Sequence, residues 1–346
     1  MKLSHEIITL RTTHPFVIAR GGSSEYRVVR VTVTADDGAT GWGEAAPSKH
    51  YGETADTVVA ALPAYAAVLE GADGWSLEAL EQQMAKAMRF NASARSAVSA
   101  ALHDLAAKRL GVPLYRMWGL DPAASPPTSF TIGIAPDEAT LRARVREAAS
   151  YPILKIKLGS SWDERVMHVV REMEPTKVLR VDANAAWTPK YALEMIPFLK
   201  ELEVEFVEQP LPAHEIAGLR FVRERSALPI VADESCLVST DIPLLDGAVD
   251  GINIKLAKCG GLREALRMIA TARALGMTVM AGCMIESSLG ITTAAHFSPL
   301  LDHADFDGAA LLADDPYEGA TIERGQIRIP DAPGLGVERR ALSVER

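Results

Sequence analysis

The feature that most constrains the fold is a series of short apolar segments at regular spacing in the later part of the chain. The candidate strands are 128–134, 153–157, 178–182, 205–208, 230–233, 251–255, 278–283 and 306–311. Each of the first seven is followed by a segment with helical apolar spacing. Eight strands at roughly 25-residue intervals fit a parallel (β/α) barrel, a modified TIM barrel, better than an open sheet. We therefore expect an α/β fold.

A different pattern precedes these strands. Two candidate strands, 28–34 and 40–44, flank the turn Asp36-Asp37-Gly38, and three helical segments follow at 55–69, 77–88 and 93–110. The Pro-, Ala- and Ser-rich stretch 121–127 is a candidate boundary. We expect an α+β capping domain over 1–122, a catalytic barrel over 123–320, and a final segment, 321–346, that packs back on the first block.

Composition excludes several classes of protein. The formal net charge is −9 and basic residues form no stripe, so we expect no nucleic-acid partner. No span of about 20 apolar residues occurs, so we expect no membrane partner. Cys236, Cys259 and Cys283 form no Cys-x-x-Cys pair, and reduced thiols indicate a cytoplasmic protein. The base rate for soluble enzymes favours a homo-oligomer.

Three carboxylates fall at the ends of successive candidate strands. They are Asp182, Glu208 and Asp233. Any one alone fits a helix N-cap or a loop charge. In a barrel, however, the carboxyl ends of the strands meet at one mouth, where carboxylates repel one another unless a cation joins them. Ligands that are all oxygen favour a hard ion such as Mg²⁺, so the pattern predicts one divalent-metal site.

Three lysines sit in the same kind of position. Lys155 and Lys157 share one face of their strand, and Lys255 lies in an apolar segment on a strand that a barrel places opposite. A surface-edge strand is the alternative for the first two. A free lysine titrates near pH ~10.4, but a nearby dication and a second lysine favour its neutral form. The arrangement predicts that Lys157 and Lys255 move a proton at a carbon next to a metal-held carboxylate.

At these residues the sequence resembles the enolase superfamily, in the muconate-lactonizing-enzyme subgroup. The motifs are Lys155-Ile156-Lys157, Asp182-Ala183-Asn184, Glu208-Gln209-Pro210, Asp233-Glu234-Ser235 and Asn253-Ile254-Lys255, together with Gly41-Trp42-Gly43-Glu44-Ala45 in the first block. The resemblance covers nearly the whole chain. It implies that Lys157 and Lys255 are catalytic and that Asp182, Glu208 and Asp233 hold one Mg²⁺.

Within the subgroup the likeness is to dipeptide epimerases, typified by those acting on L-Ala-D/L-Glu. It is carried by 282–286 with 289–291, and by Asp305-Phe306-Asp307. The resemblance implies that a dipeptide is inverted at the α-carbon of its C-terminal residue by two-base 1,1-proton transfer through an enediolate. Asp305 and Asp307 would hold the dipeptide ammonium, and Lys155 would add positive charge near the carboxylate. A carboxylate pair that caps the turn before Gly308 is the alternative.

The remaining candidate substrate contacts are less specific. Thr131, Met284 and Ile285 are candidate pocket walls, although core packing explains them equally well. Glu286 and Asn184 are candidates for orienting the site. The stretch 14–26 is expected to be a mobile lid over the barrel mouth. The resemblance places Arg20 near the arginine of the family's glutamate-selective members, which implies an acidic substrate side chain. Without that contact the pocket would take apolar or basic residues.

Two other functions fit parts of this pattern. A muconate cycloisomerase, an o-succinylbenzoate synthase or an N-acylamino acid racemase would use the same lysines and metal, but their substrates carry no ammonium for Asp305 and Asp307. A non-catalytic scaffold predicts the loss of at least one lysine or metal ligand, and the sequence retains all of them.

Overall fold

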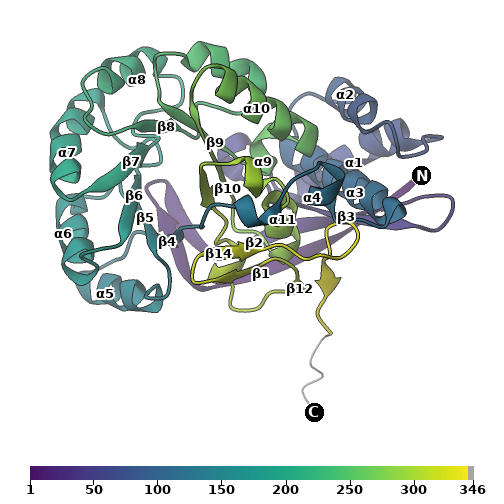
Figure 1. The fold of residues 1–346 in the computed structure, drawn as a ribbon, viewed down its shortest axis with the longest axis horizontal. Helices are drawn as coiled ribbons and strands as arrows, with labels where there is room; N and C mark the ends of the chain where they lie inside the picture. The colour runs from purple at the N-terminus through teal and green to yellow at the C-terminus, as the bar shows by residue number, and fades with distance from the viewer. Residues whose placement is uncertain (342–346) are drawn as a thin grey trace.

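The larger part of the molecule is a barrel of parallel strands (Figure 1). The computed structural model describes residues 1–341. The strands lie side by side in chain order: β4 (Phe130–Ile132), β5 (Ile153–Lys157), β6 (Val178–Asp182), β7 (Val204–Glu208), β8 (Ile230–Ala232), β9 (Gly251–Ile254), β10 (Thr278–Gly282) and β11 (His303–Asp305). A parallel bridge between Thr128 and Ala304 joins the two ends of this sheet. The predicted (β/α) barrel is confirmed.

Helices cover the outside of the barrel (Figure 1). They are α5 (Glu138–Glu147), α6 (Asp163–Met173), α7 (Pro189–Glu201), α8 (Ile216–Arg223), α9 (Leu256–Cys259), α10 (Leu262–Ala274) and α11 (Ser288–Ala295). Strand interiors such as Leu154, Val181 and Ile252 are fully buried, as expected for strands with apolar layers on both faces. Between β8 and β9 the predicted helix is a 3₁₀ helix, η3 (Ser239–Leu245). Pro243 lacks the N–H that an α-helical turn there would use.

The prediction for the eighth strand was wrong in its bounds. The strand is His303–Asp305, whereas the predicted 306–311 is a turn followed by the 3₁₀ helix η5 (Ala309–Leu311). The N–H of Phe306 donates to the Thr128 hydroxyl at 2.7 Å. This N–H is therefore bonded to a side chain instead of to the backbone of a neighbouring strand. The first strand is also shorter than the predicted 128–134.

A second block contains the antiparallel sheet β1 (Lys2–Ile18), β2 (Gly21–Thr34) and β3 (Thr40–Ala45) with the helices α1 (Ala55–Leu69), α2 (Leu77–Ala87) and α3 (Ala92–Leu110). The predicted lid loop 14–26 was wrong as a loop, because nearly all of it belongs to the β1–β2 hairpin. The residues between the two strands are Ala19 and Arg20. Figure 1 shows this hairpin extending from the N-terminal block to the barrel strands. Thus the sequence that looked mobile forms a paired ribbon.

Glycines let β3 lie directly on α3. A Cβ at Gly41 would lie 1.9 Å from the carbonyl oxygen of Ala101, and one at Gly43 would lie 2.1 Å from that of Ala97. Only a residue without a side chain permits such an approach. The close packing directs Glu44 toward the barrel, where its carboxylate accepts the N–H of Ser287 at 2.9 Å.

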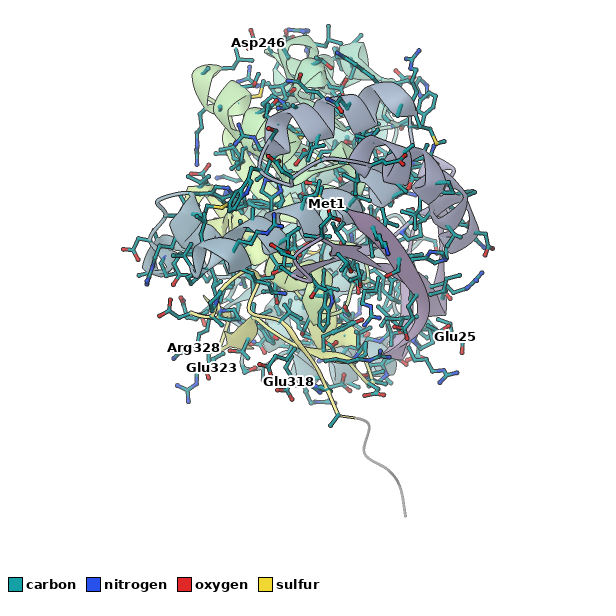
Figure 2. The ribbon with its side chains drawn as sticks, turned by 90° about the vertical axis from the view of Figure 1, so that its right-hand side faces the viewer. Met1, Glu25, Asp246, Glu318, Glu323 and Arg328 are labelled. Atoms are coloured by element: carbon teal, nitrogen blue, oxygen red, sulfur yellow. The ribbon has the colours of Figure 1, made fainter. Side chains whose placement is uncertain are left out.

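The last part of the described chain forms two small ribbons. They are β12 (Tyr317–Glu318) with β15 (Glu338–Arg339), and β13 (Thr321–Glu323) with β14 (Gln326–Arg328). Glu318, Glu323 and Arg328 lie along one edge of the molecule, with Asp246 at the opposite edge (Figure 2). The N–H of Leu335 donates to Asp104 of α3 at 2.7 Å. The predicted final segment 321–346 extends into 342–346, which lie outside the described residues, and the predicted division of the chain remains a prediction.

Within residues 1–341, the structure contains no helix that is both long enough and apolar enough to cross a membrane.

Candidate active site

Strand register brings the predicted charged residues to one mouth of the barrel. Lys157 of β5 is paired with Asp182 of β6, which in turn is paired with Glu208 of β7. These are the final residues of their strands. The carboxyl ends of parallel barrel strands converge, so side chains from distant parts of the sequence meet there.

The three carboxylates Asp182, Glu208 and Asp233 form a compact cluster. Each offers an oxygen that lies within 4.8 Å of the others, and all three residues are buried. Burial, followed by the charge of Asp182, raises the pKa of Glu208 to about 7. Burial also disfavours ionised Asp233, but Lys255 and Lys258 outweigh it and hold its pKa well below the usual value. The cluster is thus stabilised by lysines.

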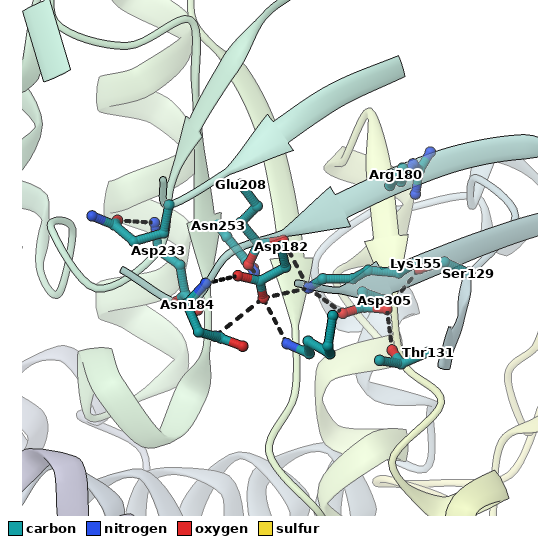
Figure 3. A network of polar contacts seen from close by, with 12 residues as sticks. Ser129, Thr131, Lys155, Arg180, Asp182, Asn184, Glu208, Asp233, Asn253 and Asp305 are labelled. Carbon is teal, nitrogen blue, oxygen red and sulfur yellow. Dashed lines mark hydrogen bonds and ion pairs between the residues drawn. The ribbon is translucent and has the colours of Figure 1, made fainter. Parts of the chain in front are cut away.

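Lys155 lies at the centre of the polar network in Figure 3. Its Nζ is 2.7 Å from Glu208, 2.8 Å from Asp305 and 3.5 Å from Asp182. Burial opposes the ammonium form, yet these carboxylates together hold the pKa of Lys155 well above its usual value. Lys155 is therefore a fixed positive charge that joins the three-carboxylate cluster to Asp305.

Lys157 and Lys255 enter the cavity from opposite walls, because β5 and β9 are four strands apart in an eight-stranded barrel. The Lys157 Nζ lies 2.6 Å from Oδ2 of Asp182, and the Lys255 Nζ lies 2.8 Å from Oδ2 of Asp233. Burial lowers the pKa of Lys255, but Asp233 raises it further, and the net direction is upward. Each lysine is hydrogen-bonded to one carboxylate of the cluster.

Lys258 belongs to this network and was missed in the sequence. Its side chain is fully buried, and its Nζ lies 2.5 Å from Oδ1 of Asp233 and 3.0 Å from the carbonyl oxygens of Cys236 and Asn253. The signal available was its spacing, since a lysine three residues after Lys255 in an apolar stretch lies on the same side of a helical turn.

Residues of the loops after β6 and β7, together with one residue of β9, hold the carboxylates in place. Asn184 follows Asp182 with a positive φ of 45°, and its N–H donates to Oδ1 of Asp182 at 2.8 Å. Gln209 accepts the N–H of Asp233 at 2.9 Å, and Asn253 donates to Glu208 at 2.7 Å. A left-handed backbone at a residue other than glycine is uncommon and is often found at functional sites.

Asp305 and Asp307 lie together on the far side of Lys155, although Asp307 follows the strand rather than belonging to it. Ser129 donates to Asp305 at 2.6 Å, and the N–H of Thr131 donates to Asp307 at 2.5 Å. Burial raises the pKa of Asp307 to about 7, with Asp305 adding to the effect. Asp305 is also buried, but Lys155 lowers its pKa to about 2.

These residues open on a cavity of about 660 Å³ between the barrel and the β1–β2 hairpin. Its lining includes most of the predicted residues: Arg20, Thr131, Lys155, Lys157, Asp233, Lys255, Met284, Ile285, Asp305 and Asp307. Glu286 is not among the lining residues, and its carboxylate instead accepts the N–H of Met284 at 2.9 Å. Arg20 is paired with Glu234 at 2.7 Å, so its guanidinium is already engaged.

Two family models match the sequence of this chain. Residues 138–342 match the family model described as "Enolase C-terminal domain-like", and residues 4–119 match "Mandelate racemase / muconate lactonizing enzyme, N-terminal domain". The chain belongs to the enolase superfamily. The lysines and carboxylates at the barrel mouth are thus those of an enolase-superfamily barrel, and the hairpin above them belongs to its N-terminal domain.

Relatives within the superfamily match along almost the whole length of this chain. The L-Ala-D/L-Glu epimerase of Bacteroides thetaiotaomicron is 39% identical, with 97% of this chain and 88% of that protein covered. The hydrophobic dipeptide epimerase of Roseobacter litoralis is 40% identical, with 97% and 98% covered. The structure of the dipeptide epimerase from Enterococcus faecalis, complexed with Mg and L-Leu-L-Tyr, has a TM-score of 0.93 at 31% identity, with 98% and 99% covered.

The donor set of this enolase-superfamily site fits a magnesium ion. Asp182, Glu208 and Asp233 offer only carboxylate oxygens, which a hard divalent cation prefers, and they converge within one ligand sphere. Three buried carboxylates repel one another, and in the structure Lys155, Lys157 and Lys255 compensate that charge. A cation would take over the same electrostatic task.

Proposed function

We propose that the protein is a magnesium-dependent dipeptide epimerase that inverts the α-carbon of the C-terminal residue. The observation that carries the proposal is the placement of Lys157 and Lys255 on opposite walls of a cavity that also contains the buried pair Asp305 and Asp307. The dipeptide epimerases among the relatives support the same reaction. A substrate with a carboxylate at one end and an ammonium at the other matches these charges.

The residues of the chain bind the two ends of the dipeptide. Asp182, Glu208 and Asp233 would hold the magnesium ion, which supplies positive charge to a substrate carboxylate and makes the adjacent proton more acidic. Lys155 adds a fixed positive charge next to that position. Ser129 donates a hydrogen bond to Asp305, and the N–H of Thr131 donates one to Asp307. The two carboxylates held in this way accept hydrogen bonds from the dipeptide ammonium.

The lysines then move the proton. A dication held by Asp233 would weaken the effect by which this carboxylate raises the pKa of Lys255, and would so favour the neutral amine. One of the two lysines, Lys157 or Lys255, accepts the α-proton in its neutral form, and the other donates a proton to the opposite face of the same carbon. The hydrogen bonds to Asp182 and Asp233 hold the two amines in position. Because each lysine serves one face, the roles exchange when the reaction runs in reverse.

The pair Asp305 and Asp307 also separates this reaction from the others in the subgroup. A cycloisomerase or an N-acylamino acid racemase substrate carries no free ammonium, and a buried carboxylate without a cation is unfavourable. Lys155 balances Asp305, but the carboxylate of Asp307 is bonded to Thr131 and forms no ion pair with a lysine among residues 1–341. A cationic group of the substrate would compensate the negative charge of Asp307.

The proposal can be tested with a library of L,L-dipeptides incubated with the enzyme and Mg²⁺ in deuterium oxide. We expect deuterium at the α-carbon of the C-terminal residue only, inversion of that centre without cleavage, and loss of both when EDTA removes the metal. Exchange in N-acylated amino acids but in no free dipeptide would overturn the proposal in favour of another enzyme of the subgroup.

We also propose that the chain divides into a capping unit of residues 1–122 with 321–346 and a barrel of residues 123–320, and that it works as a cytoplasmic homo-oligomer. Three free cysteines, two of them buried, support a reducing compartment. Limited proteolysis and light scattering test these two points. Cleavage confined to other sites, or a purely monomeric mass, would contradict them.

A further inference from the structure

The tip of the β1–β2 hairpin forms a roof over the cavity, and an arginine fastens it. Arg20 donates from Nη1 to the carbonyl oxygen of Asn184 at 2.6 Å, and its Nη2 lies 2.7 Å from Oε1 of Glu234. Both partners follow barrel strands, β6 and β8. The side chain of Glu234 is only 1% exposed, whereas that of Arg20 is 32% exposed. Arg20 therefore ties the hairpin to the barrel and neutralises a buried carboxylate.

Other contacts show that the roof is seated on the barrel. The carbonyl oxygen of Val17 accepts the N–H of Ile134, just beyond β4, at 2.8 Å. A Cβ at Gly159, after β5, would lie 2.6 Å from Cβ of Ala19. The hairpin tip thus meets the ends of β4, β5, β6 and β8. The position of the hairpin tip depends on the hydrogen bond between Ile134 and Val17, on its close approach to Gly159, and on the contacts of Arg20.

Beneath the roof the cavity lining includes a group of apolar residues that could receive a substrate side chain. Under the proposed function the carboxylate end of the dipeptide would lie at the metal site formed by Asp182, Glu208 and Asp233, and its ammonium at Asp307, so the side chain of the reacting residue would be directed toward the hairpin. The walls there are Phe16, Ile18, Tyr26, Val28, Ala46, Pro47 and Ile285. An apolar side chain gains free energy by leaving water for such a surface.

Most charged residues around this wall are already bonded to a partner, and Lys49 at the rim is the exception. Arg27 makes two hydrogen bonds of 3.1 Å to Asp56, and Glu25 lies 3.0 Å from Arg11. The carboxylate of Glu53 accepts two N–H groups at the start of α3, at 2.6 and 3.0 Å. Among these groups the two guanidinium ions each have a carboxylate partner, and the carboxylate of Glu53 is occupied by backbone N–H groups.

We infer from these contacts that Arg20 is a positioning residue that holds the roof closed, and that the cavity accepts a C-terminal residue with an uncharged, apolar side chain. The inference deepens the proposed function and rests on it. An acidic side chain that approached Arg20 would compete with the buried carboxylate of Glu234 for the single positive charge of the guanidinium, and two carboxylates beside one cation repel each other. A basic side chain would meet carboxylates that already have partners.

Lys49 offers a matched control. It lines the outer rim of the cavity in the 3₁₀ helix η1 (Lys49–Tyr51), is exposed, and forms no ion pair with any residue that the structure describes. Water and salt screen such a charge, so we expect it to contribute little to substrate choice. Arg20 is a half-buried cation with a carboxylate partner, whereas Lys49 is an exposed cation, so changes at the two sites can be compared directly.

The first test measures initial rates of α-deuteration in deuterium oxide for L-Ala-L-Leu, L-Ala-L-Phe, L-Ala-L-Glu and L-Ala-L-Lys with the Mg²⁺-loaded enzyme. We expect the two apolar dipeptides to exchange about tenfold faster or more than the two charged ones. Equal or faster exchange of a charged dipeptide overturns this inference and leaves the proposed function standing. Exchange in none of the four overturns the proposed function itself.

The second test uses Glu234→Gln, which removes the charge that engages Arg20. We expect the ratio of the L-Ala-L-Glu rate to the L-Ala-L-Leu rate to rise about tenfold, while Lys49→Met leaves it unchanged. Both rates come from one enzyme preparation, so partial misfolding cancels in the ratio. An unchanged ratio in Glu234→Gln, or a ratio that falls in Lys49→Met, overturns the role assigned to Arg20.

Discussion

Lys258 and Asp233 form a fully buried ion pair at the barrel mouth, with 2.5 Å between Nζ and Oδ1 and side-chain exposures of 0% and 1%. The other oxygen of Asp233 contacts Lys255 at 2.8 Å. One proposed metal ligand is therefore held between two lysines. Lys255 faces the cavity, whereas Lys258 lies behind the carboxylate and fixes its orientation.

Lys258→Met should lower the stability of the metal-free protein by about 3 kcal/mol, because three backbone carbonyls and one carboxylate oxygen lose a buried donor. Urea unfolding followed by circular dichroism measures the change. Lys190→Met is the control, since that side chain is 88% exposed and should change stability by less than about 0.5 kcal/mol. Equal midpoints for the two variants would contradict the structural role of Lys258.

Lys157→Met and Lys255→Met should each reduce epimerisation by about a hundredfold or more, since each removes one proton carrier. Because each lysine serves one face of the carbon, each variant should still exchange the α-proton of one epimer and not of the other. Mass spectrometry of an L,L- and an L,D-dipeptide in deuterium oxide measures this. Either variant epimerising at the wild-type rate, or both exchanging the same epimer, would exclude the two-base mechanism.

Asp307→Asn should raise the KM for the dipeptide about tenfold while Mg²⁺ affinity, measured by calorimetry, changes little, because the lost charge is the partner of the ammonium. Asp302→Asn, outside the cavity lining, is the control. The pKa of Asp307 is raised to about 7, so its charge is present above that pH and lost below it. Wild-type KM should therefore rise as pH falls through 7. An equal loss of metal and dipeptide binding would argue against this role.

Glu81 should make the folded protein less stable as pH rises. Its carboxylate is buried between the N-terminal helices and α10, where it accepts the Ser99 hydroxyl at 2.6 Å, and burial raises its pKa to about 7 from 4.5. The folded state holds this proton between pH 4.5 and 7 while the unfolded state has released it, so the stabilisation is complete below 4.5 and disappears above 7.

Glu81→Gln, which cannot ionise, should therefore gain up to about 3 kcal/mol relative to the wild type between pH 5 and pH 8. Urea unfolding at both pH values provides the comparison. Glu78→Gln is the matched control, because the pKa of Glu78 is lowered, with the hydrogen bond from Arg263 as the largest cause. A pH-independent difference between Glu81→Gln and the wild type would show that Glu81 stays ionised in the folded protein.

The alternation of apolar strands with helices was enough to predict the barrel, and the placement of Asp182, Glu208, Asp233, Lys157 and Lys255 at strand ends was enough to predict that they meet. Both follow from local pattern plus one rule of topology, that the carboxyl ends of parallel barrel strands share a mouth. The helices over 55–69 and 77–88 were also predicted closely, because their apolar spacing is a local property of the sequence.

Three features depended on contacts between distant residues. The stretch 14–26 looked like a lid because of Gly21 and Gly22, yet cross-strand pairing makes it a hairpin. The eighth strand ends at Asp305 because Thr128, far away in the chain, takes the N–H of Phe306. Arg20 looked available to a substrate until the fold placed Glu234 beside it.

The sequence by itself determined which residue types stand at the barrel mouth, since periodicity and strand ends are written in neighbouring residues. Only the tertiary structure decided which of those charges are already paired. Whether a charge is free depends on partners that are tens to hundreds of residues away, and burial, which sets the strength of each pairing, exists only once the chain has folded.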